Sequence, residues 1–145
     1  MLDRPRFGEQ LCYSIYSASL VIKRLYKPLL DEMGVTYPQY LVLNVLWEQD
    51  KQTIGHIGDT LSLEISTLTP LLKRLESEGF IRRERSPGDE RKVFISLLEK
   101  GKALEAQSLC LSNTLLCSSG LALTTLQRLN QEIIALRTNI VKGIS

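Results

Sequence analysis

Residues Thr53–Leu97 read TIGHIGDTLSLEISTLTPLLKRLESEGFIRRERSPGDERKVFISL, and this stretch decides the fold that we predict. Apolar spacing and the capping residue Thr53 predict a short helix to about Leu61, followed by a turn at Ser62-Leu63. A second helix is expected from about Glu64 to Glu78, stopped by Gly79. Two short helices and a following hairpin are the order of a winged helix-turn-helix, a DNA-binding unit.

The second helix of this stretch has two chemically different faces. Its inner face is apolar, with Ile65, Leu68, Leu72 and Leu75. Its outer face carries small and hydroxylic residues and then cations: Ser66, Thr67, Thr69, Pro70, Lys73 and Arg74. Small residues can approach base edges while longer cations reach phosphates, so this face suits a major groove. Pro70 fits without strain only if the helix effectively starts near Thr67, and otherwise kinks its first turns.

A hairpin follows, with strands predicted over Phe80–Arg85 and Lys92–Leu97 and a turn at Ser86–Asp89. Basic residues, Arg85 among them, outnumber acidic ones near its tip. Asp89 and Arg91, two residues apart, are expected to pair and to hold the guanidinium ready for a narrow minor groove. Taken alone, the hairpin is equally well explained by solvated surface charges. After a helix with that outer face, DNA binding is favoured.

Flanking helices complete a fold that is mainly α with a small β wing. A long helix is predicted over Gly8–Met33, bent or divided at Pro28, and a buried one from Thr36 to about Trp47 with a Thr36/Gln39 capping box. After the wing we expect a helix over Glu99–Leu115, a break at Cys117–Gly120, and a last helix from Thr124 or Thr125 with an apolar stripe: Leu126, Leu129, Ile133, Leu136 and Ile140.

The terminal helices have apolar stripes longer than a winged helix can cover, which indicates a dimer interface. The alternative is an intramolecular hairpin of the two terminal helices. We therefore predict one domain over residues 1–145, with a DNA-binding lobe at 36–98 and dimerisation helices at 1–35 and 99–145.

Composition excludes several other classes of protein. The chain has 145 residues, 43% hydrophobic, and a net charge of +2, with no apolar run long enough for a membrane span and no apolar signal core. A cytoplasmic protein without membrane contact is expected. Three cysteines without a Cys-x-x-Cys pair, and a single histidine, His56, predict neither a disulfide framework nor a metal site, and no cofactor is expected.

The segment LTPLLKRLESEGFIRRERSPGDERKVFISLLEKG resembles the recognition helix and wing of the MarR family of bacterial repressors, and its DER turn is a specific part of that match. The N-terminal residues LCYSIYSAS and YKPLLDEMGVTYPQYLVLNVLWE narrow the resemblance to the organic-hydroperoxide-sensing, OhrR-type branch. The resemblance covers almost the whole chain and is weakest over 106–120. One departure is Leu98, where relatives commonly have a capping threonine.

The resemblance implies a reactive cysteine at Cys12, with Tyr26 and Tyr37 reaching it from the other subunit and Tyr16 as a further aromatic residue nearby. A thiolate attacks a peroxide O–O bond to give a sulfenic acid, and phenolic O–H groups can donate to that thiolate. From periodicity alone, Cys12 is equally a core cysteine.

In the two-cysteine type of this branch, a second cysteine resolves the sulfenic acid as an intersubunit disulfide. Cys117 matches that position, beside a predicted flexible break. Cys110 is the other candidate, and its alternative role is that of a small buried hydrophobic residue.

The resemblance therefore implies a homodimeric repressor of a pseudo-palindromic double-stranded operator, released by organic hydroperoxide, and not an enzyme. Three alternatives remain. The first is a MarR-type repressor released by a non-covalent phenolic ligand. The others are a thiol peroxidase that uses Cys12 and Cys117, and a purely structural dimerisation module.

Overall fold

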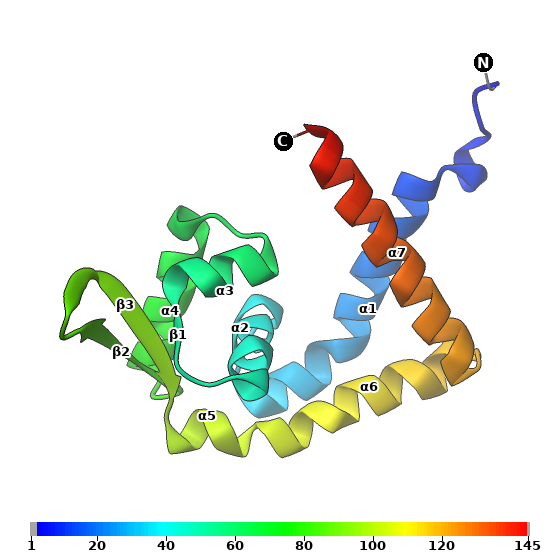
Figure 1. The fold of residues 1–145 in the computed structure, drawn as a ribbon. Coiled ribbons are helices and arrows are strands. Elements are labelled where there is room, and N and C mark those ends of the chain that lie inside the picture. The colour runs from blue at the N-terminus through cyan, green and yellow to red at the C-terminus, as the bar shows by residue number, and fades with distance from the viewer. Residues whose placement is uncertain (1–2, 145) are drawn as a thin grey trace. The chain divides into compact units, whose positions relative to one another are not determined.

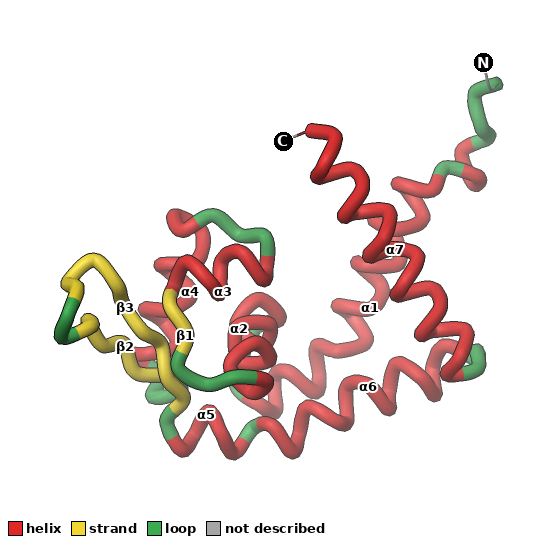
Figure 2. The backbone as a smooth tube through the Cα atoms, viewed as in Figure 1, coloured by secondary structure: helices red, strands yellow, loops and turns green. Residues whose placement is uncertain are grey.

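The structure is a computed structural model that describes residues 3–144, and it consists of helices with one small antiparallel sheet (Figures 1 and 2). The chain forms two compact units, a larger one to Leu109 and a smaller one from Cys110. The elements are η1 Phe7–Glu9, α1 Leu11–Met33, α2 Tyr37–Glu48, β1 Gln52–Thr53, α3 Ile54–Leu61, α4 Ile65–Ser77, β2 Ile81–Ser86, β3 Asp89–Leu97, α5 Glu99–Ala103, α6 Glu105–Ser119 and α7 Leu123–Ile144.

The first helix, α1, is continuous, so the predicted division at Pro28 is wrong. Proline removes one backbone hydrogen bond, but burial of Leu30 and Met33 in the turns that follow stabilises the helix beyond it. The helix begins at Leu11 rather than Gly8, because residues Phe7–Glu9 form a separate 3-10 turn. It ends as predicted at Gly34, whose φ of 77° is left-handed and favours glycine.

A capping box starts α2, as the sequence predicts. The Thr36 amide donates to Gln39 Oε1 at 2.9 Å, and the Gln39 amide donates to the Thr36 hydroxyl at 3.4 Å. The helix lies in the centre of the larger unit, where Val42, Leu43 and Leu46 are fully buried. Further fully buried apolar side chains of this unit come from the next helices, the residue before β2 and the sheet: Ile57, Leu68, Leu72, Leu75, Phe80, Ile81 and Ile95.

The helix-turn-helix forms as expected. Thr53 caps α3 by accepting from the His56 amide at 3.1 Å, and Ser62 ends it with a left-handed φ of 57°. Pro70 lies inside α4, which starts at Ile65 and not near Thr67. Because Leu68, Leu72 and Leu75 are fully buried, packing holds the helix together across the missing proline hydrogen bond.

The sheet has three strands in the order β1-β3-β2, all antiparallel, rather than the predicted two. The third strand is the pair Gln52–Thr53, opposite Ile95 and Phe94 of β3. Two residues are too few to show an alternating pattern, so the sequence gives no sign of this strand. Figure 2 shows the longer β2–β3 hairpin extending to one side of α2 and α3.

The helix predicted after the wing is divided at Leu104 into α5 and α6. The break predicted at Cys117–Gly120 is wrong for its first three residues, which are helical. Helix α6 includes Cys117 and runs to Ser119, whose hydroxyl donates to the Leu116 carbonyl at 2.8 Å and accepts from the Leu121 amide at 3.1 Å. Only Gly120, with a φ of 67°, leaves helical geometry. Serine therefore caps this helix instead of interrupting it.

The last helix, α7, begins at Leu123, slightly before the predicted Thr124 or Thr125. It has no buried residue, and the predicted stripe is solvent-facing, with Leu129, Ile133 and Ile140 each more than two-fifths exposed. Over residues 3–144, no single helix is long and apolar enough to cross a membrane; Glu99–Ser119 meets such a criterion only together with α7, across a bend.

The predicted DNA-binding lobe, residues 36–98, lies within the larger unit. The assignment of the flanking helices to dimerisation stays a prediction.

Replacing Thr36 with alanine removes the hydroxyl that caps α2. We expect the free energy of unfolding to fall by about 1 kcal/mol, because one amide at the helix N-terminus loses its acceptor. Chemical denaturation of wild type, Thr36→Ala and Thr36→Ser measures this. Thr36→Ser keeps the hydroxyl and should retain most of the stability; equal losses in both variants would contradict the role of the cap.

Candidate nucleic-acid interface and thiol site

The outward face of α4 is built as the sequence predicts. Ser66, Thr67, Pro70, Lys73 and Arg74 are exposed, while Leu68, Leu72 and Leu75 anchor the opposite face. Thr69 is half-buried, and its hydroxyl donates to the Ile65 carbonyl at 2.8 Å. The exposed side chains form a strip of small residues followed by two cations, which matches the order in which a helix meets bases and phosphates.

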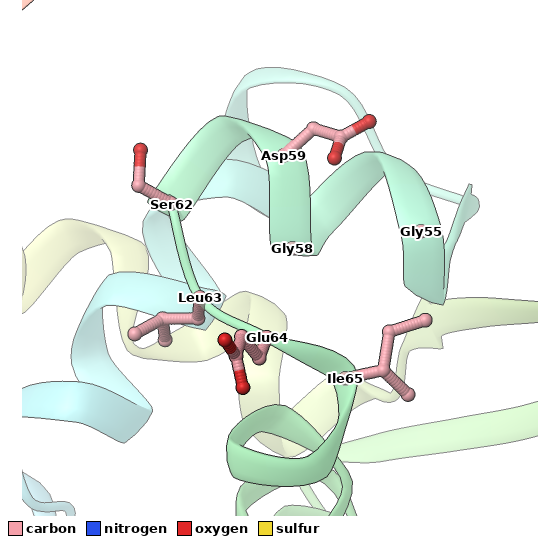
Figure 3. Close-up of a pocket in the computed structure, with 7 residues that line it drawn as sticks. All are labelled: Gly55, Gly58, Asp59, Ser62, Leu63, Glu64 and Ile65. Carbon is pink, nitrogen blue, oxygen red and sulfur yellow. The ribbon is translucent and has the colours of Figure 1, made fainter. Parts of the chain in front are cut away.

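A hollow lies where α3 turns into α4, lined by Gly55, Gly58, Asp59, Ser62, Leu63, Glu64 and Ile65 (Figure 3). Gly58 permits the tight turn, because a Cβ there would lie 2.9 Å from the Leu63 carbonyl oxygen. The prediction that Ile65 packs inward is wrong, since this side chain is 55% exposed. Side chains in a helix tilt toward its N-terminus, so at the first residue of α4 the side chain projects past the packed face.

Ile65 is thus a surface residue at the start of α4 that sequence periodicity missed. It also lines a second hollow, which reaches the wing residues Arg91, Lys92 and Val93. The position of Ile65 directly after the turn could have identified it, because the inward-facing periodicity of α4 begins only after its first residue.

At the wing tip, the predicted pairing of Asp89 with Arg91 is confirmed. Asp89 Oδ1 accepts from the Arg91 amide at 3.0 Å and from Arg91 Nε at 3.3 Å, and the Arg91 side chain is 93% exposed. Arg85 is used differently, because its Nη1 donates to the Glu90 carbonyl at 2.9 Å and joins the two strands. Arg91 is therefore the cation that projects, while Arg85 shapes the tip.

An ion pair that sequence reasoning did not anticipate joins α4 to the wing. Glu76 of α4 accepts from the Arg83 amide and from Arg83 Nε of β2, each at 3.1 Å. Both side chains are only about one-third exposed, so this pair is screened less than the other charges of the wing. The strip on α4 and the wing are thereby held in one orientation.

The structure brings two of the predicted thiol-site residues together. The rings of Tyr26 and Tyr37 have centroids 6.2 Å apart, and the series continues to Tyr40 and Trp47. Burial, and the neighbouring phenols, raise the pKa of Tyr26 and of Tyr37 above the ordinary value. Both phenols therefore keep their protons at neutral pH and can donate hydrogen bonds.

Cys12 is exposed near the start of α1, so its interpretation as a core cysteine is wrong for the single chain. Tyr16 lies one turn further along and is 64% exposed. Tyr26 is about four turns, or about 21 Å, along the same continuous helix. One chain thus brings Tyr16, but not the Tyr26–Tyr37 pair, close to the thiol.

The other two cysteines, Cys110 and Cys117, are both exposed on α6 in the smaller unit. The interpretation of Cys110 as a small buried hydrophobic residue is therefore wrong. Within residues 3–144, no group of three or more His, Cys, Asp or Glu residues is placed to hold a metal ion.

Comparison with known proteins agrees with this geometry. A family model described as transcriptional regulator SarA/Rot matches residues 24–107. The chain is 45% identical, over 79% of its length and 78% of the relative's, to the organic hydroperoxide resistance transcriptional regulator of Bacillus subtilis. The chain belongs to the MarR-type family of winged-helix transcriptional regulators. This confirms the resemblance to the hydroperoxide-sensing branch that the sequence indicates, and with it a DNA-binding regulator.

Two solved MarR-type structures extend the comparison, both of AbfR, a protein of Staphylococcus epidermidis. Reduced AbfR bound to DNA superposes with a TM-score of 0.80 at 35% identity, covering 97% of this chain and 96% of that one. AbfR with its disulfide formed gives a TM-score of 0.65 at 36% identity, covering 96% and 92%.

Arg91→Ala tests the projecting cation of the wing. We expect weaker binding to a DNA duplex that the wild-type protein has enriched from a random-sequence library, here called the selected duplex. The slope of log affinity against log salt should become shallower by about one for each chain bound, because each wing loses one cation that lies among the DNA phosphates. Fluorescence anisotropy across a salt series measures both. Lys23→Ala, which removes an exposed cation from α1, is the control; equal changes in the two variants would contradict a wing contact.

Proposed function

We propose that the protein is a dimeric, redox-sensing repressor that leaves its operator when organic hydroperoxide oxidises Cys12, which then forms an intersubunit disulfide with Cys117. The observation that carries this proposal is the separation on α1. An exposed thiol lies about 21 Å along one continuous helix from Tyr26, whose neutral phenol neighbours that of Tyr37 at the start of α2. A second copy of the chain is needed to bring a Tyr26–Tyr37 pair to Cys12.

The DNA-binding half of the proposal rests on α4 and the wing. In a two-fold symmetric dimer, the α4 strips of two chains would enter successive major grooves, about 34–36 Å apart, on a pseudo-palindromic operator. The exposed Arg91 of each wing would enter the flanking minor groove. Ser66, Thr67, Thr69 and Pro70 would face base edges, while Lys73 and Arg74 would contact phosphates.

Dimerisation is supported by the apolar surface that each unit leaves exposed. On the N-terminal segment and α1 these residues are Phe7, Leu11, Tyr13, Tyr16, Leu20 and Val21. On α7 they include Leu129, Ile133, Ile134, Ile140 and Val141. Apolar stripes of this length are larger than the scattered exposed residues of a monomer and fit an interface between identical chains.

The redox step follows from the residue types. The Cys12 thiolate attacks one oxygen of the hydroperoxide; an S–O bond forms, the O–O bond breaks, and the alcohol leaves after taking up a proton. The Cys117 thiolate then attacks the sulfenic sulfur, an S–S bond forms, and water leaves. The peroxide is the oxidant and both thiols are oxidised. Phenolic protons of Tyr26 and Tyr37 would stabilise the attacking thiolate.

Names of relatives support a link between DNA binding, thiol oxidation and hydroperoxide. AbfR is known in a reduced form bound to DNA and in a disulfide form, and the Bacillus subtilis relative is named for organic hydroperoxide resistance. In the single chain both Cys12 and Cys117 are exposed, so each thiol is open to groups supplied by a second copy. Disulfide formation would change the spacing of the two α4 helices and release the operator.

Cys12→Ser is the direct test of this switch. In a gel shift on the selected duplex, cumene hydroperoxide should release the reduced wild-type protein and leave Cys12→Ser bound, because serine cannot form a sulfenic acid. Cys110→Ser, which removes a thiol from the same helix as Cys117, is the matched control and should be released like wild type.

Three results would overturn the proposal. Release of Cys12→Ser as readily as wild type would eliminate the redox mechanism. Release of Cys12→Ser by salicylate would favour a non-covalent phenolic effector. Repeated turnover of peroxide with thioredoxin, without loss of the selected duplex, would favour a thiol peroxidase.

A further inference from the structure

The short helix α5 follows β3 in the chain and contacts the C-terminal end of α4. Its N-cap is Leu98, which has no side-chain oxygen to accept from the first amides. The Leu98 amide instead donates to the Phe80 carbonyl at 3.0 Å. Phe80 comes directly after Gly79, the left-handed residue that ends α4. The start of α5 is thus hydrogen-bonded to the residue that follows the Gly79 stop of α4, and it has no side-chain cap of its own.

Lys100 makes the second connection between the two helices. Its Nζ donates to the carbonyl of Glu78, the C-cap residue of α4, at 2.7 Å. The same ammonium lies 4.4 Å from the centroid of the Phe80 ring. The last carbonyls of a helix have no amide partner and form the negative end of its dipole. Lys100 therefore places a positive charge where α4 is most negative and also stacks it on an aromatic face.

Gly101 brings the backbone of α5 into direct contact with the same corner. A Cβ at Gly101 would lie 2.4 Å from the Phe80 carbonyl oxygen, so no other residue fits without a shift of the backbone. On its other side, the Gly101 carbonyl accepts from Trp47 Nε1 of α2 at 2.9 Å. Because α5 is held from two directions, it is a fixed support against which the end of α4 can be set.

We propose that Lys100 is a positioning residue for DNA binding, which fixes the C-terminal end of α4 against α5 and so sets the places of Lys73 and Arg74. The proposal rests on the DNA contact proposed for α4. The Glu78 amide donates to the Arg74 carbonyl at 3.0 Å, so a shift of Glu78 shifts the turn that carries both cations. Lys100 acts on DNA through this turn and does not contact DNA itself.

Two other roles for Lys100 make different predictions. A lysine that contacts a phosphate would lower both the affinity and its salt dependence when it is removed. A lysine that only adds to the surface charge would be equivalent to its neighbour Lys102, which is also exposed and makes only an ion pair with Glu99 at 3.5 Å. Positioning alone predicts lower affinity together with faster hydrogen exchange of the amides at the end of α4, which the loss of a phosphate contact by itself does not predict.

The test compares Lys100→Met, Lys100→Arg and Lys102→Met with wild type on the selected duplex, by fluorescence anisotropy across a salt series. Lys100→Met keeps the apolar stem and should lower affinity about threefold to tenfold, as the loss of a charged hydrogen bond and a cation–π contact implies. Lys100→Arg should recover most of the affinity, and Lys102→Met should stay within about twofold of wild type.

Hydrogen exchange provides a second measurement that does not depend on DNA. The amides of Glu78, Gly79 and Phe80 should exchange faster in Lys100→Met than in Lys102→Met, while amides in the middle of α4 should not change. An unchanged affinity in Lys100→Met, or a lower affinity without faster exchange of these three amides, would overturn the positioning role. A failure of the DNA contact proposed for α4 would look different. In that case Lys73→Ala and Arg74→Ala would each bind the selected duplex as tightly as wild type.

Discussion

A rigid helix that keeps the thiol away from its own tyrosines is the constraint on which the proposed switch depends. Helix α1 is continuous through Pro28, so Cys12 and Tyr26 cannot approach each other within one chain. Tyr26 is buried and Tyr37 half-buried, and both keep their protons, whereas the thiol is exposed. A chemical site divided in this way becomes complete only when two chains assemble, which ties sensing to the dimer that positions both α4 helices.

Helix α4, the wing and α5 are connected to one another and are expected to move together. Buried leucines hold α4 against the core, the Glu76–Arg83 pair ties it to the wing, and Lys100 ties its far end to α5. The two polar connections each include a hydrogen bond between a side chain and a backbone group, which fixes orientation better than a contact between two flexible side chains. A movement applied to α5 would therefore move the strip and the wing together, and would change the distance between the two halves of a dimer.

The features of this fold that could be predicted from the sequence are those that depend on helical periodicity or on contacts between residues close in the chain. The capping box at Thr36, the stop at Gly34 and the Asp89–Arg91 pairing all depend on residues a few positions apart, and all are present. Other features were not predicted correctly. The strand Gln52–Thr53 exists only because β3 pairs with it, and Ile65 is exposed because α4 begins there. Ser118 and Ser119 resemble a break, but Ser119 bonds back to its own helix. The role of Cys12 came from family resemblance, because periodicity could not separate a core thiol from a reactive one.

The central claim is that the oxidised site joins two chains. Dimers mixed from ordinary and ¹⁵N-labelled protein, treated with cumene hydroperoxide and digested without reduction, test it directly by mass spectrometry. The account predicts disulfide-linked peptides containing Cys12 and Cys117, in which half of the linked pairs combine one light and one heavy peptide. Linked peptides that are always both light or both heavy, or Cys12 joined to Cys110 instead, would contradict it.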